Sequence, residues 1–187
     1  MSSTNSRPKE NVWDYPRPPA LERTDRLLEV KWVYPDGHEV DVATTREAYR
    51  VLETSHPPTY YLPPSSIHSD NVKLSVENGK SSFCEWKGTA AYHTLKIPSS
   101  SGSPSASVTS RIWSYPSPTP SFKPIKDYLS FYASSSSNSR ESKGHWKCLV
   151  DGENVKAQEG DFYGGWITSD VHGGPKGFKG ASGTYGW

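Results

Sequence analysis

Proline and glycine interrupt this chain so often that few stretches remain in which a long helix could form. The 187 residues include 16 prolines and 15 glycines, which favour turns and extended segments. Hydrophobic residues make up only 33%, yet there are 7 Trp, 11 Tyr and 5 Phe, and each buried ring removes on the order of 150–250 Å² from water. The sequence therefore predicts a mainly β fold with an aromatic core, of a size typical of a single compact domain.

Short alternating segments predict the strands of twisted antiparallel sheets. Three hairpins are expected, each around a turn that contains glycine: residues 28–42, 83–97 and 147–155. Residues 112–116 and 125–132 are predicted to be further strands. One short helix is expected from Thr44 to about Glu53, because Thr44 and Glu47 have the spacing of a capping box and Pro57-Pro58 would end it.

The two ends of the chain and two serine-rich segments are predicted to lie outside the sheets. Residues 1–11 are polar and expected to be disordered, and residues 12–187 form the single domain. Residues 12–19 predict an extended polyproline-type arm. Glycine at every third position from Gly174 to Gly186 predicts a second extended arm at the C-terminus. The serine-rich segments, at about 98–109 and 134–144, are predicted to be loop insertions.

Charge and composition narrow the classes of partner. With 21 basic and 20 acidic residues and no basic cluster, neither nucleic acid nor an anionic membrane is an expected partner. No apolar run opens the chain, so we expect neither a signal peptide nor a membrane anchor and infer a cytoplasmic protein. Cys84 and Cys148 are predicted to be free thiols, and no metal or cofactor is expected. Homo-oligomerisation stays open.

Two stretches carry the candidate site residues. The first contains Cys84, Glu85, Trp86 and Lys87, a thiol, carboxylate, indole and amine in succession, which are costly to bury unless paired. The second contains Glu53, His56 and Tyr61, where carboxylate and imidazole lie three residues apart. We predict Glu53, His56, Tyr61 and Lys87 as catalytic residues, and Cys84, Glu85, Trp86, Trp113 and Tyr115 as substrate-binding residues. For Cys84, core packing remains an alternative.

Several of these segments resemble one uncharacterised family. The chain is similar, over about residues 12–187, to the family named domain of unknown function 427, found in bacteria and fungi. The matching segments are residues 13–19, 50–58, 60–61, 84–88, 113–116 and 162–170. The resemblance implies a small all-β fold similar to the tent-like sheets of certain zinc-binding domains. Those domains use four cysteines, which this chain lacks, so no zinc site is expected.

Two functions remain open from the sequence. The first is a small-molecule enzyme that uses cofactor-independent acid/base chemistry, such as isomerisation, cyclisation, dehydration or hydrolysis, in an aromatic-lined pocket. Here desolvation would lower the pKa of Lys87, which could then act as a base or imine former. The alternative is a non-catalytic module that binds a small molecule or a protein, in which Lys87 and Glu85 form a buried ion pair.

Overall fold

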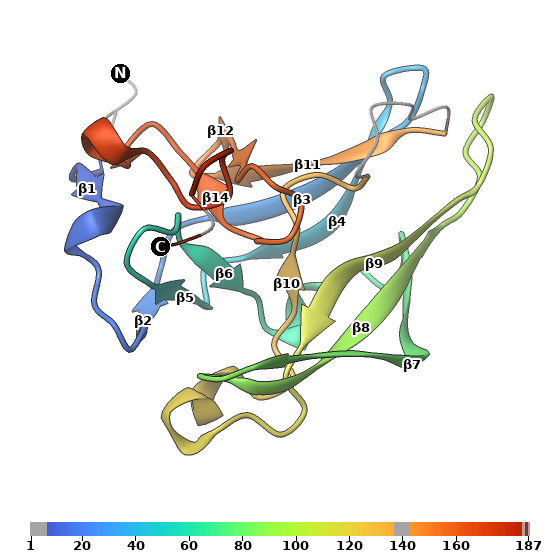
Figure 1. Ribbon diagram of the computed structural model, residues 1–187. Helices are drawn as coiled ribbons and strands as arrows, with labels where there is room; N and C mark the ends of the chain where they lie inside the picture. The colour runs from blue at the N-terminus through green and yellow to red at the C-terminus, as the bar shows by residue number, and fades with distance from the viewer. Residues whose placement is uncertain (1–6, 137–142, 185, 187) are drawn as a thin grey trace.

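The computed structural model describes residues 7–136, 143–184 and 186, and it consists mainly of antiparallel sheets (Figure 1). One four-stranded sheet has the order β12 (Glu153–Asn154), β11 (His145–Val150), β3 (Leu28–Val33), β4 (Glu39–Thr45). The other has the order β10 (Ser130–Phe131), β9 (Ala106–Ser114), β8 (Gly88–Ile97), β7 (Lys73–Cys84). The predicted mainly β class is confirmed.

Three smaller sheets complete the strands. They are formed by β2 (Ala20–Thr24), β5 (Ala48–Leu52) and β6 (Thr59–Tyr61), by β13 (Lys156–Ala157) with β14 (Trp166–Ile167), and by β1 (Glu10–Asn11) with β15 (Val171–His172). Helical structure in the described residues is confined to 3-10 turns: η1 (Val12–Asp14), η2 (Pro64–Ser66), η3 (Pro120–Ile125) and η4 (Gly174–Lys176).

The core lies between the two four-stranded sheets and is built around aromatic rings. Along β3 every second side chain is buried, which is the alternation expected of a strand with one face on a core. Trp32, Trp146, Trp166, Tyr60 and Phe131 belong to this core. The indole N–H groups of Trp146 and Trp166 donate to the carbonyl oxygens of residues 132 and 131, at 3.0 and 2.8 Å. These bonds offset the cost of burying the indole N–H groups.

All three predicted hairpins are present, but one predicted strand is mostly absent. The pairs β3–β4, β7–β8 and β11–β12 cover the segments expected from alternation and turn residues. Of residues 125–132, however, only Ser130–Phe131 is a strand. Before this strand, η3 ends at Ile125 and the chain turns at Asp127, whose φ is +62°.

The helix predicted from Thr44 to Glu53 is wrong, because this segment forms the end of β4 and all of β5. The Thr45 hydroxyl accepts from the backbone N–H of Glu47 at 2.9 Å, so the threonine side chain closes a tight turn between strands. β5 then pairs with β2 on one side and β6 on the other. Those two ladders satisfy the backbone groups that a helix would have paired internally.

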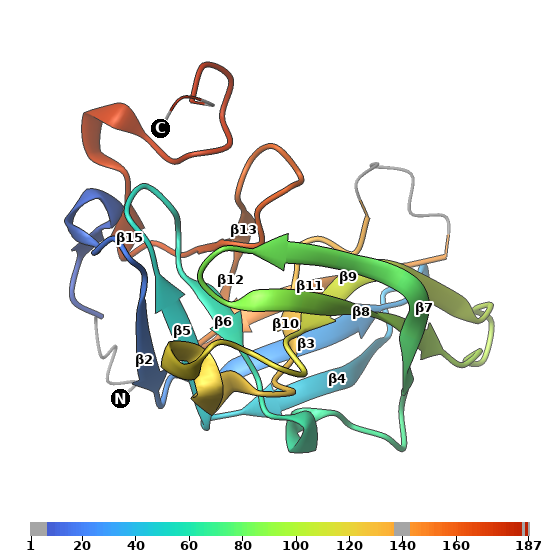
Figure 2. The same cartoon turned by 60° about the horizontal axis from the view of Figure 1, so that its bottom comes forward.

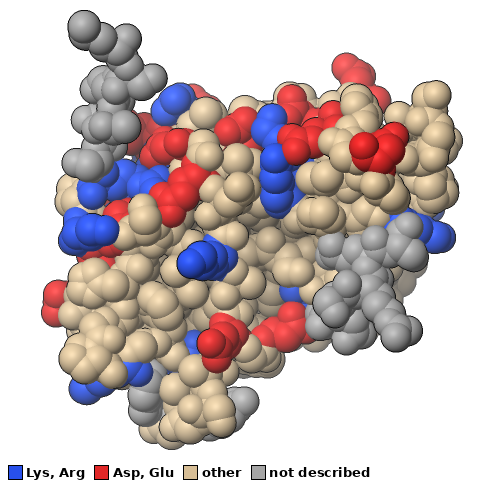
Figure 3. All heavy atoms as spheres, turned by 90° about the horizontal axis from the view of Figure 1, so that it is seen from above, with Lys and Arg blue, Asp and Glu red and all other residues tan. Residues whose placement is uncertain are grey.

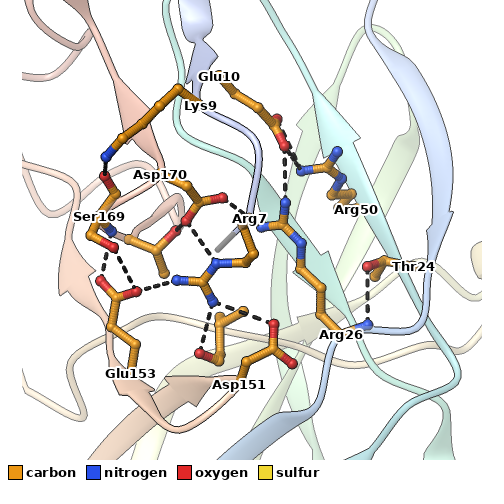
Figure 4. A network of polar contacts seen from close by, with 12 residues as sticks. Arg7, Lys9, Glu10, Thr24, Arg26, Arg50, Asp151, Glu153, Ser169 and Asp170 are labelled. Atoms are coloured by element: carbon orange, nitrogen blue, oxygen red, sulfur yellow. Dashed lines mark hydrogen bonds and ion pairs between the residues drawn. The ribbon is translucent and has the colours of Figure 1, made fainter. Parts of the chain in front are cut away.

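Residues 7–11 were predicted to be disordered, but they are held by strand pairing and ion pairs (Figure 4). β1 pairs in parallel with β15, near the other end of the chain. Arg7 donates to Glu153 and lies 3.0 Å from Asp170. Residues 1–6 lie outside the described residues.

Glu10 is the centre of this polar network. Its carboxylate accepts from Arg50 at 2.8 Å, from Arg26 at 2.9 Å and from the Tyr15 hydroxyl at 2.6 Å. Arg50 also binds Glu22 across the β2–β5 ladder at 2.7 Å. The side chains of Arg26 and Arg50 are almost entirely removed from solvent, so the network attaches the N-terminal arm to β5 through groups that would be costly to leave unpaired.

The C-terminal arm does not have the polyproline geometry expected from its glycines. Polyproline II requires negative φ, whereas Gly177 and Gly180 have φ of +73° and +109°. The arm bonds to the body instead, since Lys179 N–H donates to Ser55 O at 2.8 Å and Gln158 donates to Lys179 O at 2.7 Å. The glycine spacing reflects repeated turns.

The first serine-rich segment is a shorter loop than predicted, whereas the second lies between β10 and β11. β9 begins at Ala106, within the first predicted insertion of 98–109. In the second, 134–144, residues 137–142 lie outside the described residues, while Ser135 accepts from Trp146 N–H at 3.1 Å. Among the described residues, no helix is long and apolar enough to cross a membrane.

Replacing Glu10 should reveal how much the network stabilises the fold. We expect Glu10→Gln to lower the free energy of unfolding at pH 7 by about 3 kcal/mol, because two largely buried guanidinium groups would lose a charged partner. Urea denaturation of the full chain measures this change. Glu47 is exposed, so Glu47→Gln is the matched control. It should change the free energy of unfolding by less than about 0.5 kcal/mol. Equal effects of the two substitutions would contradict a structural role for Glu10.

The same network predicts a loss of stability in acid. Burial of the Glu10 and Asp170 carboxyls opposes ionisation, but hydrogen bonds to Glu10 from Tyr15 and Arg50, and to Asp170 from Thr168, together with nearby arginines, lower both pKa values below their ordinary 4.5 and 3.8. A lowered folded-state pKa contributes stability above the ordinary pKa that is lost as the pH falls through the folded value. Thermal unfolding below pH 4.5 should therefore be less pH-dependent for Glu10→Gln than for the parent chain. An equal pH dependence of the unfolding temperature in the variant and the parent chain would contradict this prediction.

Candidate functional site

All the residues predicted as a site line one cleft of about 870 Å³. One wall is the sheet of β7, β8 and β9, a second is formed by β5, β6 and the turn after β5, and a third is the loop at 158–164 with Lys179. Figure 2 shows how the β7–β8 hairpin reaches across towards β5 and β6. The cleft contains Glu53, His56, Tyr61, Cys84, Glu85, Trp86, Lys87, Trp113 and Tyr115.

The turn at residues 53–56 is fixed from both ends of the chain. His56 N–H donates to Glu53 O at 3.0 Å, which closes the turn, and Ser55 has φ of +72°. Ser55 N–H donates to Val12 O at 3.0 Å, and Ser55 O accepts from Lys179 N–H at 2.8 Å. The N-terminal and C-terminal arms thus hold the backbone that carries His56.

His56 is a neutral base near pH 7 with a defined tautomer. Its Nδ1 lies 3.0 Å from Thr54 O, and because a carbonyl can only accept, Nδ1 carries the hydrogen and Nε2 carries the lone pair. Burial lowers the pKa of His56 below its ordinary 6.5; Glu53 opposes this shift, and the ammonium groups of Lys179 and Lys87 add to it. The ring also packs edge-on against Tyr163, with centroids 4.9 Å apart.

Lys87 is a cation in this cleft, contrary to the expectation that desolvation would make it a neutral base. Burial alone would lower its pKa, but the neighbouring side chains of Tyr61, Cys84, which also hydrogen-bonds to it, and Glu53 raise the pKa above its ordinary 10.5. The ammonium lies 5.8 Å from the ring centroids of both Tyr115 and Phe122. A lysine that stays protonated binds negative charge and does not form imines at neutral pH.

The hairpin tip that carries Lys87 is held by the segment before η3. Thr119 N–H donates to Lys87 O at 3.1 Å, and the Thr119 hydroxyl donates to Trp86 O at 2.6 Å. Gly88 turns the chain with φ of +99°, a conformation that side chains strongly disfavour. Glu85, at the same tip, is exposed and lies 3.8 Å from Arg17, so the ion pair expected between Glu85 and Lys87 is not the one observed.

Aromatic rings form the floor of the cleft. Tyr61 is fully buried, and its hydroxyl accepts from Trp113 Nε1 at 3.4 Å. Burial raises the pKa values of Tyr61 and Tyr115, so both phenols are neutral near pH 7. Tyr61 has no solvent-exposed surface, so it forms the base of the cleft beneath Trp113 and is not itself in contact with water.

The structure also brings charged and aromatic residues into the cleft that the sequence did not single out. They are Arg17, Lys80, Tyr92, Arg111, Tyr132, Asp161, Phe162, Tyr163 and Lys179, together with the polar Gln158. One signal was available: Arg111, Trp113 and Tyr115 alternate along β9 and beyond it, so they share a face. Residues 162–164 belong to one of the segments that resemble the family, but nothing in that resemblance placed them at the cleft. Lys179 gave no signal, because its place depends on how the C-terminal arm folds back.

A second groove, of about 1010 Å³, lies against the opposite face of the same sheet. It contains none of the predicted residues. Its walls are largely apolar, and on its sheet wall His93 Nε2 lies 2.9 Å from the Ser114 hydroxyl. We place the candidate site in the first cleft, where several titratable groups converge.

More cations than carboxylates line the cleft. Among the residues that the structure describes, no group of three or more His, Cys, Asp or Glu side chains could hold a metal ion. Five cationic side chains and three carboxylates line the cleft. On the face in Figure 3, charges of both signs are interspersed.

The electrostatic coupling between Lys87 and His56 can be measured directly. We expect Lys87→Gln to raise the pKa of His56, because it removes a positive charge that disfavours the imidazolium. Histidine NMR titration of the full chain, with the His56 signal assigned by His56→Asn, measures the shift. Lys73→Gln, in the second groove, should leave the His56 pKa unchanged. An unchanged or lower His56 pKa in Lys87→Gln would contradict the coupling.

Comparison with known proteins identifies a family but no characterised relative. The model of the family described as "Domain of unknown function (DUF427)" matches residues 20–142. No curated protein matches the chain. The matched segment includes β2 to β10 and both stretches from which the site was predicted, and it ends before loop 158–164 and the C-terminal arm. The chain is therefore a member of the DUF427 family.

Proposed function

We propose that the chain is an enzyme that transfers protons on a small organic molecule in this cleft, with His56 as the general base. One observation carries the proposal: a neutral imidazole of fixed tautomer and a protonated Lys87 line the same partly enclosed, aromatic-walled cleft. A base and a cation together are what proton abstraction next to a carbonyl requires, since one group removes the proton and the other stabilises the oxyanion.

The steps follow from these two groups. His56 Nε2 takes a proton from the carbon next to a substrate carbonyl, and the electrons of the C–H bond move to the carbonyl oxygen. The resulting enolate is stabilised by the Lys87 ammonium. Return of the proton from the imidazolium to another carbon completes an isomerisation. Transfer of the same proton to a departing β-hydroxyl completes a dehydration, with water as the product.

Neighbouring residues support these roles without touching the reacting atoms. Thr54 O fixes the His56 tautomer, and the Glu53 carboxylate stabilises the imidazolium that forms after proton transfer. Tyr61 and Trp113 form the floor, and Tyr115 packs near the Lys87 ammonium. Glu53 and Tyr61 are thus positioning residues in this proposal.

Deuterium exchange tests the role of His56 without knowledge of the natural substrate. In D₂O, the chain should catalyse exchange at the acidic C–H of aryl ketones and β-keto esters, read by NMR. His56→Asn should lower the exchange rate by about 10²–10⁴-fold, as removal of a general base does. The control variant Lys73→Gln, which changes a residue of the second groove, should catalyse exchange at the rate of the parent chain. Ligands that bind without exchange would favour the alternative, a non-catalytic binding module, and full exchange by His56→Asn would exclude His56 as the base.

The pH profile of exchange provides a separate check. The base form of His56 predominates above its pKa, which lies below 6.5, and Lys87 stays charged until the pH passes its pKa, which lies above 10.5. The exchange rate should therefore rise with pH below 6.5, reach a plateau near neutrality and fall above 10.5. A rate that increases steadily between pH 7 and 10 would instead indicate that a deprotonated lysine is the base.

Lysine substitutions separate an electrostatic role of Lys87 from imine formation. Lys87→Arg keeps the positive charge and should retain at least a tenth of the exchange activity, whereas Lys87→Gln should lose most of it. Borohydride added during turnover should not attach a ketone to Lys87, since no imine forms. Trapping of a reduced adduct at Lys87 would contradict the electrostatic role.

A further inference from the structure

We infer that the ligand of the cleft is a planar, conjugated anion, such as an aromatic carboxylate or an ionised enol or phenol of a ring system. This inference rests on the proposal that the cleft binds the substrate, and it specifies the substrate class. It is drawn from how the cations of the cleft are held and from what forms its apolar surface.

Four of the five cations of the cleft are held over aromatic rings. Arg111 lies 4.0 Å from the Tyr132 ring centroid, Lys80 lies 4.8 Å from that of Tyr92, and Arg17 lies 6.0 Å from that of Trp86. Lys87 lies 5.8 Å from Tyr115 and Phe122, as described above. Cation–π contacts stabilise these charges without neutralising them, so they remain available to attract an anion.

The carboxylates of the cleft do not balance these charges. Five cations and three carboxylates line it, which leaves an excess of two positive charges when His56 is neutral. Asp161 lies 2.7 Å from Arg111, and Glu85 lies near Arg17 at the exposed hairpin tip. The field in the cleft therefore favours a ligand with one or two negative charges over a neutral or cationic one.

The apolar surface of the cleft is mainly aromatic. Val51 and Pro57 are the aliphatic side chains among its described lining residues, whereas nine aromatic residues contribute to it. Rings stack on planar ring systems in offset or edge-to-face geometry, and the guanidinium of Arg111 presents a further flat surface. Saturated ligands of the same volume lack these contacts, so flat conjugated molecules fit this surface best.

Two exposed phenylalanines mark the rim of the cleft. Phe83 on β7 and Phe162 on loop 158–164 are 78% and 76% exposed, although both rings are large and apolar. Phe162 packs edge-on against Tyr163, which in turn contacts His56. Both phenylalanine rings belong to the lining of the cleft, so they extend its aromatic surface outwards.

Three matched probes separate charge from planarity. We would titrate the full chain calorimetrically with 2-naphthoate, with the neutral 2-naphthamide and with the saturated decalin-2-carboxylate. Naphthoate should bind at least tenfold more tightly than either other probe, and its affinity should fall as salt is added. Equal affinity for naphthamide would overturn the anionic character, equal affinity for the decalin acid would overturn the planar character, and failure of naphthoate to bind would overturn both.

Variants on one strand provide the matched control. Lys80 and Lys73 are both exposed lysines of β7, but Lys80 lines the cleft and Lys73 lines the second groove. Lys80→Gln should weaken naphthoate binding at least threefold and leave naphthamide binding unchanged, whereas Lys73→Gln should affect neither. Equal effects of the two substitutions would show that general surface charge, and not the cleft, attracts the anion, and would overturn the inference.

His56→Asn distinguishes this inference from the proposed function. The variant should bind naphthoate with affinity close to that of the parent chain, because the inferred recognition depends on cations and rings. Selective naphthoate binding by a chain that catalyses no deuterium exchange would refute the enzyme proposal alone. Exchange that requires His56 but occurs equally well with neutral saturated ketones would refute the substrate class alone.

Discussion

The carboxylate of Glu10 is the group on which the position of the N-terminal arm depends. It binds two largely buried guanidinium groups, one from β5 and one from the segment after β2, and it accepts from Tyr15 in the N-terminal arm. Buried cations are costly unless paired, so this network strongly favours one position for the arm. That position brings Val12 to the backbone of Ser55, and the arm thereby fixes the turn that carries His56.

The sheet of β7, β8 and β9 divides the molecule into two different environments. Because successive side chains of a strand point to opposite faces, Tyr92 and Trp113 lie in the cationic, aromatic cleft, while their neighbours His93 and Ser114 lie in the apolar groove behind it. A shift of register by one residue would exchange these two sets. The pairing of Tyr92 with Trp113 therefore determines the chemistry of both faces.

Electrostatic interactions hold the two titratable groups of the proposed chemistry in opposite protonation states, with His56 neutral and Lys87 charged. Burial and neighbouring cations keep His56 neutral, while acidic neighbours keep Lys87 charged. Placed in the same cleft, the two groups reinforce this division, because the charge on Lys87 disfavours protonation of His56. Pairs of titratable groups whose environments shift their pKa values apart are a common basis for acid/base catalysis.

The sequence by itself determined the β class, the three hairpins and a set of polar residues that lie together, because alternation, turn glycines and unusual polar runs are local signals. It misidentified β5 as a helix, since a Thr-x-x-Glu spacing is compatible with a capping box and with a tight turn, and only ladders to β2 and β6 decide between them. It also gave the wrong direction for the Lys87 pKa, which depends on acidic groups from distant segments. Loop 158–164, Lys179 and the order of residues 7–11 were decided by tertiary structure alone, because these segments are held by partners from other parts of the chain, such as Arg111 for Asp161, Ser55 for Lys179 and β15 for β1.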